Sequence, residues 1–90
     1  MEMRIVVPSV ESATALAERL TLEFGSGPVS LRGEHREVDI RLEQDSDRVV
    51  LHVFDAVDRW LDQAGAAFAE MWLGERSYRL ARWVPADLWR

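Results

Sequence analysis

Cysteine and lysine are both absent from this chain of 90 residues, and it has no long apolar run. Without cysteine there is no disulfide framework and no thiolate chemistry, which fits a reducing compartment, so we expect a cytoplasmic protein. No apolar stretch approaches the ~20 residues that a membrane span requires. The first such stretch, residues 5–7, stops at Pro8, so we expect neither a signal peptide nor a membrane partner.

The basic residues are all arginine and are scattered from Arg4 to Arg90. A cluster of arginines would indicate bidentate recognition of carboxylate or phosphate. Because the arginines are scattered, we interpret the absence of lysine as the codon usage of a GC-rich genome. The formal net charge is −5. Nucleic-acid binding needs clustered positive charge to displace counterions from phosphates, so we expect no nucleic-acid partner.

The length and composition are those of a folded protein with one core. Hydrophobic residues make up 48% of the chain and charged residues 30%, which is ordinary for a globular protein and argues against disorder. Ninety residues suffice for a single domain spanning residues 1–90.

The beginning of the chain predicts a strand followed by a helix. Apolar side chains recur at every second position, at Met3, Ile5 and Val7, which predicts a strand that ends at Pro8. Ser9 is a favourable helix N-cap, and apolar residues then recur at helical spacing from Val10 to Phe24. The glycine-rich stretch 25–28 predicts the end of this helix.

Residues 28–54 predict a three-stranded meander. One register places Leu31 opposite Val38, and then Leu42 opposite Val49 across a polar turn. The apolar side chains then share one face, and a slip of one residue would turn them all to solvent. In this register Asp39 lies opposite His52.

The end of the second helix has two interpretations. The helix is expected to begin at Asp55, and Gly65 is either its C-terminal cap or lies within a longer helix over residues 56–73. We favour the cap, because residues 67–73 then form a strand that turns at Gly74 and pairs Glu70 with Arg79 on one face.

With that choice the fold class is α+β, with two β-α-β-β units, at residues 1–44 and 47–84, followed by a tail at 85–90. The two units build one mainly antiparallel six-stranded sheet with both helices on one face. In outline this resembles the strand-helix-strand-strand modules of several bacterial ligand-binding and scaffold proteins, but the resemblance carries no motif. The alternative, with residues 56–73 as one helix, is a ferredoxin-like or ACT-like sandwich.

No catalytic motif is evident. Asp39 and His52 form the kind of pair that orients a general base, but no nucleophile joins them by motif, and a solvated hydrogen bond is the favoured interpretation. Two histidines without cysteine give no metal-ligand spacing, and Gly25 and Gly27 precede a strand, whereas phosphate cradles precede a helix. We therefore expect no enzyme, no metal and no cofactor.

The aromatic residues are the most informative feature for function. Strand parity places Phe54, Trp72 and Trp83 on the sheet face opposite the helices, and apolar groups on an exposed face are typical of interfaces. We predict a protein-interaction or regulatory module that binds a protein partner or forms a homodimer. The alternative is a small-molecule groove on the same face. The candidate binding residues are Phe54, Trp72, Trp83, Glu70, Arg79 and His52.

Overall fold

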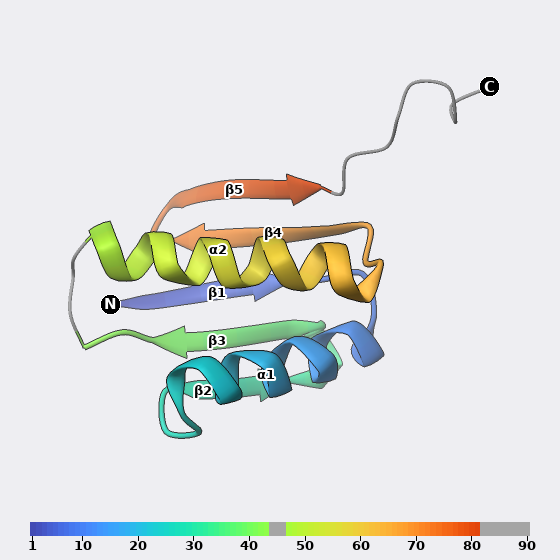
Figure 1. The fold of residues 1–90 in the computed structure, drawn as a ribbon, viewed down its shortest axis with the longest axis horizontal. Coiled ribbons are helices and arrows are strands. Elements are labelled where there is room, and N and C mark those ends of the chain that lie inside the picture. Colours follow the sequence, from blue (N-terminus) through green and yellow to red (C-terminus); the bar gives the residue numbers. More distant parts are fainter. Residues whose placement is uncertain (44–46, 82–90) are drawn as a thin grey trace.

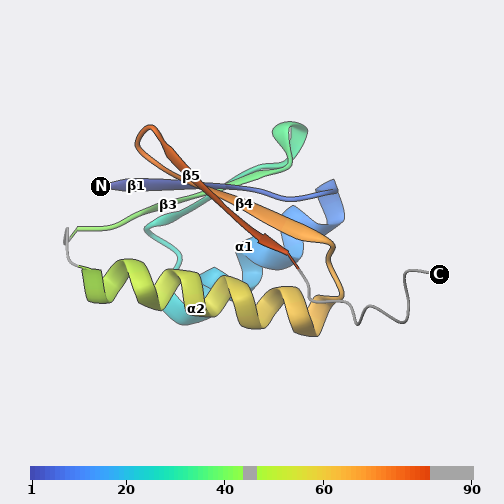
Figure 2. The same cartoon turned by 90° about the horizontal axis from the view of Figure 1, so that it is seen from above.

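The computed structural model describes residues 1–43 and 47–81, which form one antiparallel sheet and two α-helices (Figure 1). The elements in chain order are β1 (Glu2–Val6), α1 (Val10–Phe24), β2 (Val29–Arg32), the 3₁₀-helix η1 (Gly33–His35), β3 (Glu37–Arg41), α2 (Asp47–Ala64), β4 (Phe68–Leu73) and β5 (Arg76–Ala81). The strands lie side by side in the order β2-β3-β1-β4-β5. Both helices pack on the same face of the sheet (Figure 2).

The strand β1 occupies the centre of the sheet. It pairs antiparallel with β3 on one side and with β4 on the other, so that Ile5 lies beside both Val38 and Met71. The element order β1-α1-β2-β3-α2-β4 is that of the ferredoxin-like arrangement. The strand β5 extends this arrangement as a hairpin on β4.

The predictions that rest on local sequence signals are confirmed for the first helix. The N-terminus of α1 is capped by Ser9, whose hydroxyl oxygen accepts a hydrogen bond from the Ser12 amide at 3.1 Å. The helix ends at Gly25, which has a φ of 89° and donates its amide hydrogen to the Thr21 carbonyl. A positive φ of this kind favours glycine over residues with a Cβ.

Two of the three predicted hairpin registers are also confirmed, whereas the register that placed Leu42 opposite Val49 is wrong, because Val49 belongs to α2. Leu31 lies opposite Val38 between β2 and β3, and Glu70 lies opposite Arg79 between β4 and β5. Gly65, with a φ of 68°, follows the last residue of α2 as the predicted cap. The alternative of one helix over residues 56–73 is therefore wrong, although the ferredoxin-like order that it implied is present.

The predicted strand over residues 48–54 is wrong, and the sheet has five strands instead of six. These residues form the first turns of α2, which begins at Asp47, so the predicted N-cap at Asp55 is wrong as well. Val49, Leu51 and Val53 alternate as in a strand, but Val53 and Val57 also fit the helical period. The predicted neighbour of this segment was the strand at residues 38–42, but β3 pairs with β2 on one side and with β1 on the other, so that position is already occupied.

The core lies between the sheet and the two helices. The strands contribute Met3, Ile5, Val38, Ile40, Ala69 and Met71, and the helices contribute Leu16, Leu20, Val53, Val57, Trp60 and Leu61. All of these side chains are buried. Within the described residues, neither helix has the length and apolar character needed to cross a membrane.

Two leucine-to-alanine substitutions on α2 test the helical assignment of this segment. Leu51 is 66% exposed and Leu61 is 2% exposed. We expect Leu61→Ala to lower the free energy of unfolding by about 2–5 kcal/mol, because it leaves a cavity in the core. Leu51→Ala should change that energy by no more than about 0.5 kcal/mol, because alanine suits an exposed helical position.

Urea unfolding followed by circular dichroism measures both values. If residues 48–54 were a core strand, Leu51 would face Ile40, and the two variants would lose comparable stability.

Candidate interaction face

One face of the sheet is packed against the helices, and no described element covers the other (Figure 2). Successive side chains along a strand point to opposite faces, so the residues that alternate with the core positions lie on this uncovered face. We call it the open face and define it by the residues Arg4, Val6, Ser30, Arg32, Glu37, Asp39, Phe68, Glu70, Trp72, Ser77 and Arg79.

Strand pairing arranges all of these residues except Phe68 in two rows that run across the sheet. The order of side chains in the first row is Ser30, Asp39, Arg4, Trp72 and Ser77. The second row consists of Arg32, Glu37, Val6, Glu70 and Arg79 in the same strand order. The second row is therefore symmetric about β1. Its central side chain is apolar, the next one on each side is acidic, and the outermost one on each side is basic.

The aromatic residues of the open face both lie on β4 and are each accompanied by an arginine. The Arg4 guanidinium carbon lies 5.7 Å from the Trp72 ring centroid, and that of Arg79 lies 4.5 Å from the Phe68 ring centroid. These distances are within the range of a cation–π interaction. Both rings are half-buried, so each keeps exposed surface for a further contact.

Two acidic side chains, Glu37 and Asp39, lie side by side on the strand β3. Both are buried, and Asp39 is only 5% exposed. Arg32 of the edge strand β2 holds them, with its Nε atom 3.2 Å from Asp39 Oδ2 and 3.9 Å from Glu37 Oε2. The other oxygen of Asp39, Oδ1, has no hydrogen-bond donor among the described residues.

The carboxyl group of Asp39 has a shifted pKa. Burial raises the pKa of Asp39 above its ordinary value of 3.8, and the Glu37 carboxyl raises it further through a hydrogen bond and through charge repulsion. Arg32 and Arg4 lower the pKa of Asp39 but do not reverse the shift.

The structure brings only part of the predicted site together. Trp72, Glu70 and Arg79 lie on the open face as predicted. Phe54 and His52 do not, because both belong to α2. Trp83 lies outside the described residues.

The two misplaced residues have other contacts on the helical side. Phe54 packs edge-on against Tyr78, with 5.5 Å between ring centroids. His52 packs against Phe24 at 4.8 Å, and its Nε2 atom lies 3.3 Å from Glu23 Oε2. The predicted pairing of His52 with Asp39 is therefore wrong, and the aromatic groove that included Phe54 does not form on the open face.

Sequence reasoning missed several residues of this face. Phe68 shares the parity of Trp72 within the predicted strand 67–73, so the same argument would have found it. Arg4 was not identifiable in this way, because its contact with Trp72 depends on the pairing of β1 with β4. That pairing joins segments far apart in the chain and leaves no local signal.

In the described part of the chain, no group of three or more histidine, cysteine, aspartate or glutamate residues is placed to hold a metal ion. Comparison with protein-family models, with curated proteins and with solved structures finds no match for this chain. A function for this chain therefore has to be inferred from its own geometry.

We expect Asp39→Asn to stabilise the protein at neutral pH. A raised pKa in the folded state means that folding favours the protonated form, so Asp39 contributes stability at low pH and loses that contribution as the pH rises through its pKa. Asparagine keeps the neutral shape at every pH. The melting temperature of the variant should exceed that of the wild type at pH 7, and the difference should shrink as the pH falls.

Thermal unfolding followed by circular dichroism between pH 4 and pH 7, at roughly one-unit intervals, measures this difference. Asp62→Asn makes the same chemical change at an exposed position on α2 and serves as the control. A stability difference for Asp39→Asn that stays constant or grows on acidification would contradict a raised pKa of Asp39 in the folded state.

Proposed function

We propose that this chain is a non-enzymatic protein-interaction module that binds a protein partner through the open face. The observation that carries the proposal is the pair of half-buried aromatic rings, Phe68 and Trp72, on a sheet face that no described element covers. Tryptophan and arginine are enriched among the residues that dominate binding energy at interfaces. Here each ring already lies beside an arginine side chain.

The charges of the open face argue against a nucleic acid as the partner. Sheets that bind single-stranded nucleic acid combine aromatic stacking with a positively charged surface along the phosphate backbone. On this sheet the carboxyl groups of Glu37, Asp39 and Glu70 alternate with the arginines of the open face, so the face has no continuous positive surface. The net charge of −5 is likewise unfavourable for binding phosphates.

The charges of the second row indicate which partner helix would be complementary to it. Neighbouring strands are about 4.8 Å apart, and side chains three or four positions apart on a helix are about 5–6 Å apart. A helix laid across the strands would therefore place successive side chains of one of its faces over successive strands. The complementary helix carries an apolar residue over Val6, basic residues over Glu37 and Glu70, and acidic residues over Arg32 and Arg79.

A second copy of this chain fits the open face less well when the strands of the two sheets are aligned. A twofold axis along β1 brings Arg32 over Arg79 of the other copy and Glu37 over Glu70. Like charges at an interface are unfavourable and select against such a partner. We therefore propose a partner of different sequence in preference to an aligned homodimer.

Substitutions on the open face test the proposal. We expect Trp72→Ala to weaken binding of a captured partner by about 30-fold or more, because truncating a central aromatic residue commonly removes at least about 2 kcal/mol. Arg79→Glu should also weaken binding, through reversed charge at the rim. Isothermal titration calorimetry with the purified partner gives both dissociation constants.

Matched controls on the helical side separate this effect from a general loss of charge or apolar surface. Arg48→Glu makes the same charge reversal at an exposed position of α2, and Leu22→Ala removes an exposed apolar side chain of α1. Neither should change the affinity. Circular dichroism confirms that Trp72→Ala is folded. A partner that binds all four variants equally would place the interaction elsewhere.

Light scattering coupled to size exclusion tests the alternative that the partner is a second copy of this chain. We expect the wild-type chain to be a monomer. A dimer that Trp72→Ala dissociates would make the partner a second copy in a packing other than the aligned one.

A further inference from the structure

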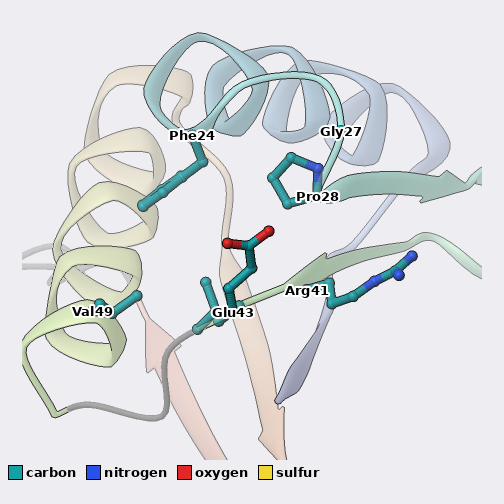
Figure 3. A pocket seen from close by; sticks show the side chains of 7 residues that line it. Phe24, Gly27, Pro28, Arg41, Glu43 and Val49 are labelled. Carbon is teal, nitrogen blue, oxygen red and sulfur yellow. The ribbon is translucent and has the colours of Figure 1, made fainter.

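A cavity of about 530 Å³ lies on the helical side of the sheet, away from the open face. It is formed where the C-terminal end of α1, the chain after β3 and the first turns of α2 meet (Figure 3). Its lining residues are Phe24, Gly27, Pro28, Arg41, Leu42, Glu43 and Val49. A volume of this size is within the range of about 300–1,000 Å³ that is typical of small-molecule sites.

The walls of the cavity are largely apolar, and one charged group points into it. Phe24, Pro28 and Val49 contribute a ring, a pyrrolidine and a branched aliphatic chain. The Glu43 carboxylate points toward the space between Phe24 and Pro28, whereas the Arg41 guanidinium points away from that space (Figure 3). Among the described lining residues, the charged group that points between these walls is therefore the Glu43 carboxylate.

The helix ends at the cavity do not reverse this sign. The C-terminal end of α1, which carries partial negative charge from unpaired carbonyl groups, borders it at Phe24. The N-terminal end of α2 carries partial positive charge, but Asp47 in its first turn offsets that charge.

We infer that this cavity binds a small hydrophobic amine, with the ammonium group at Glu43 and the apolar part between Phe24, Pro28 and Val49. A carboxylate forms strong charge-assisted hydrogen bonds with an ammonium group. An aromatic ring attracts a cation over its face, so Phe24 acts in the same direction as Glu43. This inference is independent of the proposed function of the open face.

The experiment compares three probes of similar size that differ in charge: 2-phenylethylamine, 2-phenylethanol and 3-phenylpropionate. Each is titrated into ¹⁵N-labelled protein and followed by amide chemical-shift changes. We expect the amine to shift the amides of Phe24, Gly27, Leu42 and Val49. It should bind about tenfold or more tightly than the alcohol, and the carboxylate should bind most weakly.

The variant Glu43→Gln tests the role of the carboxylate at an exposed position where substitution leaves the core intact. It should weaken amine binding about tenfold and bring the affinities for the amine and the alcohol close together. Glu75→Gln, in the exposed turn between β4 and β5, makes the same change remote from the cavity and should leave amine binding unchanged.

Three results would overturn the inference. The first is that none of the probes shifts the amides at the cavity. The second is that 3-phenylpropionate binds at least as tightly as the amine, which would assign the cavity to an anion. The third is that Glu43→Gln and Glu75→Gln bind the amine equally well.

Discussion

The hydrogen bonding of β1 to a strand on each side is the constraint on which the rest of the structure depends. β1 pairs with β3 and with β4, and it buries Met3 and Ile5 between the sheet and the helices. Because β1 takes the place beside β3 that the sequence had assigned to residues 48–54, these residues are not part of the sheet, and residues 47–64 form one long helix. That helix covers the sheet beside α1 and closes the core.

The same topology leaves one face of the sheet without a covering element among the described residues. β1 and β2 are parallel to each other, and so are β3 and β4, and each pair is joined by a helix. Connections of this kind are almost always right-handed, and in this strand order they bring both helices to the same face. The other face then collects Arg4, Asp39 and Trp72 from three neighbouring strands. No two of these residues are close in sequence, and their contacts exist only because β1 joins the two halves of the sheet.

Local signals account for the parts of the fold and of the open face that were predictable. The cap at Ser9, the helix end at Gly65 and two of the three predicted hairpin registers were predicted correctly. Each of them depends on residues a few positions apart. Glu70, Trp72 and Arg79 were placed correctly because they belong to the hairpin of β4 and β5. Phe54 and His52 were misplaced because residues 48–54 fit both a strand and a helix. The cavity beside Phe24 was not predicted at all.

The sequence by itself determined that the protein is α+β, where α1 begins and ends, and where α2 ends. It also determined the pairing of β2 with β3 and of β4 with β5. Each of these depends on turn residues, caps and apolar periodicity within a short stretch of chain. Only the tertiary structure decided that β1 lies at the centre and that residues 48–54 are helical. It also decided that Asp39 is buried beside Arg4. The physical reason is that apolar periodicity shows which side of a segment is buried but not which strand lies beside it.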